Sequence, residues 1–274
     1  MYIGKEDIKK GIRALSLQGK MVCIHSSFKS FGGHVDGGAK AFLEAFLEEG
    51  CTVLVFTCSY MYEIYPPQNL RPKRNGISDY SYFENKNYST PKIFTTDSND
   101  ISRESMGIVP YTLLNMPSSK RGYNPINSFA ALGKYADELV REQSAEDVWA
   151  PLAKLYEHRG YVLLVGVHLD RATIIHYAEQ VAGRKPFIRW ANNLKGEPSI
   201  CRVGSCSNGF NNFADRLKPI EKNVMVGKSY WRCFPAKDMV DICAAAMKEI
   251  PEISHCEDSN CDRCNDAILG GPIW

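Results

Sequence analysis

Uninterrupted apolar runs recur along the chain, separated by stretches with helical spacing. Residues 21–25, 51–57 and 161–167 read MVCIH, CTVLVFT and YVLLVGV. Short runs of this kind, rich in Val, Ile and Leu, predict strands that are buried on both faces. Because such strands alternate with amphipathic stretches, the pattern predicts an α/β fold in which helices cover both faces of a sheet.

The helices are predicted from apolar residues that repeat every three or four positions. They are expected at 39–49, 151–159, 171–182 and 238–249. Gly50 follows the first helix and Gly160 follows the second. A glycine commonly ends a helix at this position. Asp170 precedes the third, where a carboxylate can cap the helix N-terminus.

Two regions depart from this alternation. Residues 60–105 are rich in Tyr, Asn, Ser, Pro and charge, and they predict an irregular excursion over a cleft, with a plain solvated loop as the alternative. Residues 195–235 predict smaller antiparallel strands. No repeat or linker divides the sequence, so we expect one domain over 1–274, with a cysteine-rich tail at 251–274.

The composition narrows the classes of function. The 274 residues are 44% hydrophobic and carry a formal net charge of +2. This composition excludes disorder and coiled coil, and the balanced charge provides no field for binding nucleic acid. No apolar run is long enough to span a membrane, and the charged first residues lack the apolar core of a secretory signal. We expect a cytoplasmic protein with reduced thiols and without nucleic-acid or membrane partners; a homodimer stays open.

The strongest local pattern follows the strand predicted at 161–167. Asp170, Thr173 and His176 are spaced by three, which places them on neighbouring parts of one helix face. In open α/β sheets, functional residues collect at the carboxyl ends of strands, where this turn lies. An imidazole there can take a proton near neutral pH, and a hydroxyl or carboxylate one turn away can fix its tautomer. The alternative is that Asp170 is only a cap and His176 a structural, half-buried histidine.

A second pattern follows the strand predicted at 21–25. Small residues and two Gly-Gly pairs lead from this strand into the next helix. The backbone N–H groups of such a turn suit phosphate oxygens, and Lys29 could add a positive charge. No dinucleotide-binding or Walker frame is present, and a plain turn is the alternative.

Four motifs in order give the sequence a family resemblance. They are HSSFKSFGGHVDGG at 25–38, MGIVP at 106–110, NPINSFAALG at 124–133 and PLAKLYEHRGYVLLVGVHLDRATIIHYAE at 151–179. Together they resemble the aminoglycoside 3-N-acetyltransferases, antibiotic N-acetyltransferases that do not have the GNAT fold. The resemblance implies an α/β fold with a mixed central sheet, helices on both faces and smaller antiparallel strands. It also implies transfer of an acetyl group from acetyl-CoA to an amine of a 2-deoxystreptamine antibiotic, and hence antibiotic resistance.

The resemblance also implies roles for individual residues. His176 matches the motif histidine, which would act as the general base, and Asp170 and Thr173 match its polar companions. Glu179 and Tyr60 are expected on the substrate side. The residues expected to hold CoA are Ser26, Ser27, Phe28, Lys29, Ser30, Ser128 and Phe129.

The sequence departs from the family pattern in two places. Asn124 stands where the family has a histidine before proline, and residues 204–212 carry no acidic side chain to attract a polycationic antibiotic. A different small amine as acceptor, or a non-catalytic CoA-binding relative, is therefore an alternative. A further alternative is a zinc hydrolase built on His168, Asp170, His176 and Glu179, although no frame such as HExxH is present.

Six of the ten cysteines form two groups, and Cys201, Cys206, Cys233 and Cys243 are spread out along the chain. Cys23, Cys51 and Cys58 lie in or beside predicted strands and are expected to be buried thiols. Cys256, Cys261 and Cys264 form a C-x4-C-x2-C cluster, which resembles three ligands of a structural zinc site, with reduced surface thiols as the alternative. The candidates for a fourth ligand are His255, Cys206, Cys201 and Cys233.

Overall fold

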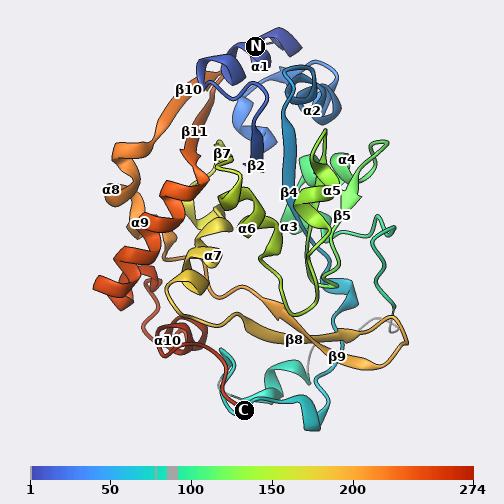
Figure 1. Cartoon of the computed structure of the whole chain (residues 1–274), viewed down its shortest axis with the longest axis vertical. Helices are drawn as coiled ribbons and strands as arrows, with labels where there is room; N and C mark the ends of the chain where they lie inside the picture. Colours follow the sequence, from blue (N-terminus) through green and yellow to red (C-terminus); the bar gives the residue numbers. More distant parts are fainter. Residues whose placement is uncertain (1, 78, 85–91) are drawn as a thin grey trace.

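A seven-stranded mixed sheet forms the centre of the protein, seen here in a computed structural model that describes residues 2–77, 79–84 and 92–274 (Figure 1). In spatial order its strands are β10 (Lys222–Val226), β11 (Ser229–Pro235), β7 (Tyr161–Val165), β2 (Met21–Ser26), β4 (Thr52–Cys58), β6 (Asn127–Leu132) and β5 (Lys120–Arg121). The neighbours β7, β2 and β4 run parallel, and the other neighbouring pairs are antiparallel. The mixed central sheet expected from the sequence is confirmed.

The three apolar runs predicted as buried strands are the three central parallel strands. Val22 pairs with Val53 on one side and with Tyr161 on the other, and each of these strands is almost wholly buried. Because the strands are parallel, their carboxyl ends meet at one edge, where Ser26 pairs with Val165. The loops after β2 and β7, which carry the predicted chemistry, therefore start side by side.

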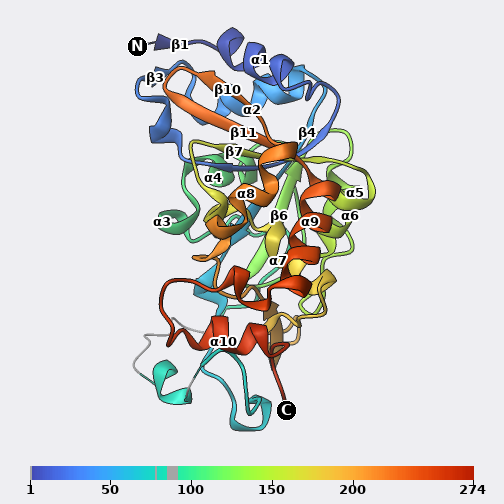
Figure 2. The ribbon, with the colours of Figure 1, turned by 90° about the vertical axis from the view of Figure 1, so that its left-hand side faces the viewer.

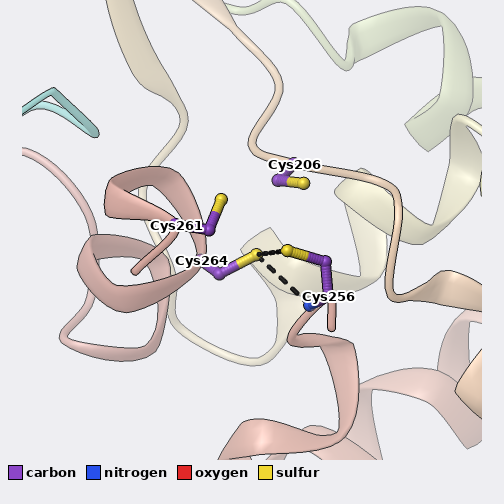
Figure 3. Close-up of side chains that lie close together, drawn as sticks. All are labelled: Cys206, Cys256, Cys261 and Cys264. Carbon is purple, nitrogen blue, oxygen red and sulfur yellow. Dashed lines mark hydrogen bonds between the residues drawn. The ribbon is translucent and has the colours of Figure 1, made fainter. Parts of the chain in front are cut away.

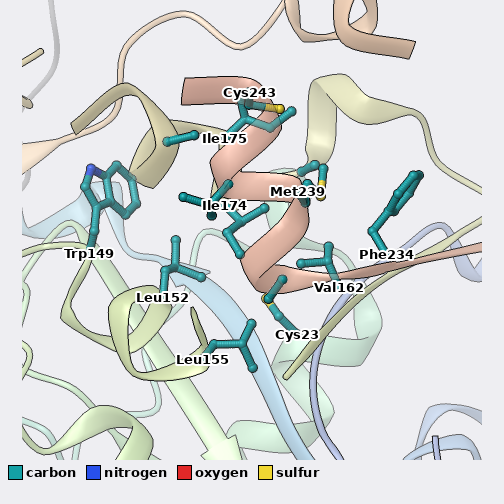
Figure 4. Close-up of a cluster of buried hydrophobic side chains, with 14 of the residues drawn as sticks. Cys23, Trp149, Leu152, Leu155, Val162, Ile174, Ile175, Phe234, Met239 and Cys243 are labelled. Carbon is teal, nitrogen blue, oxygen red and sulfur yellow. The ribbon is translucent and has the colours of Figure 1, made fainter. Parts of the chain in front are cut away.

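Side chains alternate between two apolar layers, one on each face of the sheet. Along β2, Val22 and Ile24 join one layer and Cys23 the other, as the two-residue period of a strand requires. The first layer is covered by α1 (Lys5–Ala14), α2 (Gly38–Glu48) and α4 (Ile108–Leu114). The second, drawn in Figure 4, is covered by α5 (Ala136–Val140), α6 (Ala150–Glu157), α7 (Ile174–Val181) and α9 (Ala236–Glu249). Helices on both faces are therefore confirmed.

The predicted helices are present, but one of their caps was placed wrongly. Gly50 follows α2 with a left-handed backbone (φ +78°), as expected of a residue that ends a helix. Asp170 does not cap α7: it lies in η5 (Leu169–Arg171), a single 3-10 turn, and Thr173 occupies the cap position. The helix therefore starts one turn later than the sequence pattern indicated.

Smaller elements complete the chain. The hairpin β8 (Phe187–Asn192) and β9 (Pro198–Val203) is antiparallel, as are β10 and β11, so the small antiparallel strands are confirmed, although the hairpin begins before residue 195. The remaining strands and helices are β1 (Tyr2–Ile3), β3 (His34–Val35), α3 (Arg103–Met106), α8 (Ala214–Leu217) and α10 (Asp262–Ile268). Figures 1 and 2 place α10 at the end of the molecule that also holds the C-terminus. Within the described ranges, no helix has the length and hydropathy needed to cross a membrane.

The described part of 60–105 is irregular, as expected, and it packs on the β8–β9 hairpin. It contains short 3-10 turns, η2 (Tyr60–Tyr62), η3 (Gln68–Leu70) and η4 (Tyr80–Phe83). The amide of Ile64 donates to the carbonyl of Trp190 at 2.9 Å, and the Asn75 side chain bonds both backbone groups of Ile188. Residues 78 and 85–91, which belong to the same excursion, lie outside the described residues.

Candidate active site

The centre of the candidate site is a buried pair of side chains on α7. His176 Nδ1 lies 2.8 Å from Glu179 Oε2, and the two residues are 9% and 6% exposed. A carboxylate only accepts hydrogen bonds, so Nδ1 must carry the proton that it donates to Glu179. In the neutral ring, Nε2 then keeps a free lone pair. The geometry therefore makes Nε2 the basic atom of this site.

Three neighbours fix the plane of the imidazole. Trp149 stacks on it with ring centres 5.4 Å apart and 10° between the planes, and Phe210 meets it edge-on at 4.8 Å. Gly204 faces the same ring, and a Cβ on this residue would lie 2.9 Å from both Cδ2 and Nε2 and 3.2 Å from Cε1. A side chain at position 204 would therefore press on the face of the imidazole.

A second set of contacts fixes Glu179. The Ser205 hydroxyl donates to Oε2 at 2.6 Å, and Arg184 Nη1 lies 3.3 Å from Oε1. Arg184 is itself held by Ser254 Oγ at 2.7 Å and by the carbonyl of Pro251 at 2.6 Å. Partners that bond a catalytic carboxylate hold it in one orientation, and Arg184 adds a positive charge beside it.

The predicted companions of His176 do not make these contacts. Asp170 forms an ion pair with Arg171 at 3.4 Å, and the Thr173 side chain is 8% exposed and forms no cap bond. Within the described part of the chain, neither side chain hydrogen-bonds the imidazole. Because α7 begins only after Thr173, Asp170 does not share its helix face, and Glu179, which was expected on the substrate side, is the residue that fixes the tautomer.

A small pocket opens beside this pair. Its wall contains residues from four parts of the chain, namely Trp149, His176, Glu179, Arg184, Lys185, Pro186, Gly204, Ser205 and Ala267. Ala267 belongs to α10, so the C-terminal segment contributes directly to the pocket. Several of these residues were missed from the sequence. Trp149, Arg184 and Ser205 are separated by tens of positions, and only the His176–Glu179 spacing of three gave a local signal.

The loop expected to hold CoA follows β2. Residues Phe28–Phe31 form the 3-10 turn η1, in which Phe28 packs edge-on against Phe31 and Lys29 is exposed. The amide of Ser27 donates to Val165, and that of Ser30 donates to Ser27, each at 2.9 Å. These two amides are therefore occupied within the protein, which leaves Lys29 as the exposed charge of this loop.

Ser128 and Phe129 lie in the core rather than at a surface. Both are 0% exposed, and the Ser128 hydroxyl bonds Thr57 and Arg121. Their expected role in holding CoA therefore stays a prediction, and the antiparallel pairing of β6 with β4 buries both side chains. Tyr60 is 46% exposed just after β4, and its backbone amide bonds Ser102 Oγ at 2.9 Å.

Asn124, which replaces the family histidine, joins two parts of the fold. It is 0% exposed, and its Oδ1 accepts from the amides of Ile126 and Asn127 at 3.1 and 2.7 Å. Its Nδ2 lies 3.2–3.3 Å from the carbonyls of Ser144, Ala145 and Arg202. The side chain therefore satisfies buried backbone groups.

The cysteines separate as the sequence suggested. Cys23, Cys51 and Cys58 are buried, as expected. The Sγ atoms of Cys206, Cys256, Cys261 and Cys264 all lie within 4.8 Å of one another and could hold a metal ion (Figure 3).

The structure thus selects one of the four candidates for the fourth ligand. His255 is not in the cluster because its ring bonds the Cys256 carbonyl and Asn265. Cys201 bonds Asn124, and Cys233 is part of β11. The cysteine cluster is also the one metal-type grouping found within the described ranges, so His168, Asp170, His176 and Glu179 do not form the site that the zinc hydrolase alternative requires.

Comparison of the sequence with known proteins identifies a family. The sequence profile of the aminoglycoside 3-N-acetyltransferases matches residues 23–248. An SPbeta prophage-derived aminoglycoside N(3')-acetyltransferase-like protein of Bacillus subtilis is 30% identical over 218 residues, which cover 72% of this chain and 70% of that protein. Aminoglycoside N(3)-acetyltransferase IX of Micromonospora chalcea is 30% identical over 190 residues, 66% of this chain and 63% of that protein.

Solved structures show the same fold. The apoenzyme of aminoglycoside acetyltransferase AAC(3)-IVa superposes with a TM-score of 0.75 at 23% identity, over 98% of each chain. The protein from Bacillus subtilis gives a TM-score of 0.74 over 92% of this chain and 96% of that chain, at 23% identity. The match to the family profile extends from β2 to α9 and includes both His176 and Glu179. This chain therefore belongs to the aminoglycoside 3-N-acetyltransferase family and is an acyltransferase of that type.

Proposed function

We propose that this acyltransferase moves an acetyl group from acetyl-CoA to the 3-amino group of a 2-deoxystreptamine antibiotic, and so confers resistance to it. The observation that carries the proposal is the buried His176–Glu179 pair, whose nitrogen and oxygen are 2.8 Å apart. The names of the relatives support the acceptor, since one structure of this fold is a complex with a gentamicin. Another is a binary complex with CoASH, which supports the donor.

The chemistry requires a base because the nitrogen of the neutral amine becomes positively charged when it bonds the acetyl carbon, and it must lose a proton to become an amide. His176 Nε2 would take the proton from the acceptor amine as its nitrogen bonds the acetyl carbon. The carbon–sulfur bond then breaks, and the CoA sulfur leaves as a thiolate that can take up that proton. Glu179 would stabilise the imidazolium that forms in between, and the Ser205 and Arg184 contacts would keep the carboxylate in place.

The donor is expected at the carboxyl ends of β2 and β7. Lys29 is exposed on the turn that follows β2 and could pair with a CoA phosphate. Ser26 and Ser27 start the same turn, next to the end of β7. Holding amine and thioester together would supply much of the rate without a covalent acyl-enzyme. Among the described residues no cysteine lines the pocket of His176, so the proposed transfer runs directly from the thioester to the amine without a cysteine nucleophile.

A second acceptor class is favoured by one observation. In the segment 204–212, Gly204 and Ser205 line the pocket and Phe210 packs against the His176 ring. The segment contains no Asp or Glu. A polycation gains little from such a loop. A smaller amine natural product with fewer charges is therefore the alternative acceptor.

One assay separates these acceptors. Release of the CoA thiol is followed with acetyl-CoA and a panel of aminoglycosides, with simple amines and amine-free acceptors alongside. Turnover that is fastest with a 2-deoxystreptamine antibiotic, with the product acetylated at the 3-amino group, supports the proposal. Fast turnover with the smaller amines alone supports the alternative. Binding of CoA without turnover of any acceptor would show a non-catalytic relative.

A further inference from the structure

We propose that Cys206, Cys256, Cys261 and Cys264 bind one structural Zn²⁺, and that this ion fastens the C-terminal segment to the loop that forms one wall of the His176 pocket. The metal half of this proposal does not depend on the proposed acyl transfer, because the four thiols take no part in it. The second half concerns the same pocket and rests on the proposed role of His176.

The sulfur atoms are already arranged as a four-coordinate site requires. All four lie within 4.8 Å of one another, and the sulfurs of Cys256 and Cys264 are 3.6 Å apart. A tetrahedral zinc with Zn–S bonds of about 2.3 Å places its sulfurs about 3.8 Å apart. Figure 3 shows the four side chains close together, with the sulfurs of Cys256 and Cys264 facing each other. Small side-chain adjustments would complete the tetrahedron.

The cluster joins segments that are far apart in sequence. Cys206 lies in the loop after β9, Cys256 follows the 3-10 turn η8 (Pro251–Ser254), and Cys261 and Cys264 open α10. Cys261 occupies the N-cap of that helix and Cys264 lies three positions later, which is the geometry of a C-x2-C knuckle. Since α10 has seven residues, it is too short to be stable on its own, and a metal cross-link would hold it in place.

Three of the four ligands are close in sequence to a group that shapes the pocket. Cys206 follows Ser205, which donates to Glu179, and Gly204, which faces the imidazole of His176. Cys264 lies one turn before Ala267, which lines the pocket from α10.

Cys256 has a similar relation to Arg184. It lies two positions after Ser254, whose hydroxyl bonds Arg184 at 2.7 Å. A single ion would therefore fix the loop of Gly204 and Ser205, the support of Arg184 and the α10 wall together.

Contacts with Arg74 and Gly76 also hold α10 and the residues after it. Asp266 Oδ2 accepts from the amide of Gly76 at 2.7 Å, and Arg74 donates to the carbonyls of Leu269 and Gly271. These bonds do not reach the loop after β9. Loss of the metal is therefore expected to loosen the connection between α10 and that loop while much of the fold persists.

The first test measures metal in the protein as it is. The full chain is purified without chelators, and its zinc content per chain is determined by elemental mass spectrometry. The expected result is about one zinc per chain. Replacement by Co²⁺ should give the intense visible bands of a tetrahedral four-thiolate site. Metal-free protein in which Cys256 and Cys264 react freely with alkylating agents, or form a disulfide with each other, would overturn the proposal.

Variants assign the metal to these residues. Cys206→Ser and Cys261→Ser should each lower the zinc content to a small fraction of the original and remove the cobalt bands. Cys243→Ala is the matched control, because this buried cysteine lies on α9 outside the cluster and the variant should keep its zinc. If a serine variant fails to fold, the metal content and cobalt spectrum of the unaltered chain still decide the assignment. Zinc that is retained in both serine variants would contradict it.

The link to the pocket has a separate readout. Hydrogen exchange is measured before and after removal of zinc by a strong chelator. Amides of 204–208 and of 262–268 should exchange faster together, while those of β2, β4 and β7 should stay protected. The KM for the acceptor amine should rise more than that for acetyl-CoA. Faster exchange confined to 262–268, with an unchanged acceptor KM, would show that the ion does not fix the pocket wall.

Discussion

Gly204 packs against the imidazole ring of His176: a methyl group on Gly204 would lie 2.9 Å from both Cδ2 and Nε2. This glycine shows no left-handed backbone that would require the residue type, so space alone explains the absence of a side chain. The same nitrogen is the one left basic by the bond between Nδ1 and Glu179. A side chain at position 204 would therefore displace the ring that carries this nitrogen.

Gly204→Ala should reduce acetyl transfer because the added methyl group would push the His176 imidazole out of position. We expect kcat/KM to fall by roughly 10²-fold, the scale of effect that small misplacement of a reacting group can have. Steady-state kinetics of thiol release measures it. Gly4→Ala is the control, since its Cβ would have no neighbour nearer than 3.9 Å, and it should leave the rate unchanged. Equal rates for the two variants would show that the imidazole keeps its working position despite a side chain at residue 204.

Glu179→Gln should lower kcat because an amide can donate to Nδ1 and favour the wrong tautomer. A fall of roughly 10²–10⁴-fold is expected, as for the orienting carboxylate of a catalytic triad. The control is Glu138→Gln, which alters an exposed pair in which His158 Nε2 lies 2.8 Å from Glu138 Oε1. The pH profile of kcat is measured for both. An unchanged profile in Glu179→Gln would remove this residue from the mechanism.

Asn124→Ala should destabilise the fold while leaving chemistry intact in the folded fraction. The change removes the side-chain oxygen that accepts from the buried amides of Ile126 and Asn127. A loss of about 2–4 kcal/mol in the free energy of unfolding is expected. Denaturant unfolding measures it, with the exposed Asn115→Ala as control. A stable variant with a raised KM for acetyl-CoA would instead show that Asn124 serves the donor site.

His25 should make the stability depend on pH. Burial lowers its pKa from 6.5 to about 4. Between these two pKa values, His25 is protonated in the unfolded chain but not in the folded protein. The free energy of unfolding should therefore fall as the pH falls from about 6.5 to about 4, and His25 should have no such effect above that range. His25→Gln should remove roughly 1–3 kcal/mol of this pH dependence. Urea unfolding at pH 7 and pH 5 measures the difference, with exposed His34→Gln as control. Identical pH dependence in the unaltered chain and in His25→Gln would show that this histidine does not titrate between the two states.

The sequence pattern predicted the parts of the fold that local periodicity encodes. The runs at 21–25, 51–57 and 161–167 are strands because a parallel strand covered on both faces needs continuous apolar residues. The start of α7 was misjudged, since Asp170 is a good cap in isolation but the chain first makes a 3-10 turn there. A single capping signal did not separate a 3-10 turn from the first turn of a helix.

The site was predictable only where its residues are neighbours in sequence. His176 and Glu179 are three positions apart, so both were singled out, although Glu179 was expected on the substrate side. Gly204 and Arg184 come from other segments, and only tertiary packing brings them to the imidazole. The burial of Ser128 was missed because nothing local shows that β6 lies between two other strands.

The central claim is that His176 is the general base. Its most direct test is the rate of thiol release from acetyl-CoA in His176→Ala, with CoA binding measured on the same sample. The exposed His158→Ala serves as the matched control. We predict that kcat for the preferred amine falls by roughly 10²–10⁴-fold while CoA binding persists, and that the control keeps full activity. Undiminished turnover of that amine by His176→Ala would contradict the account.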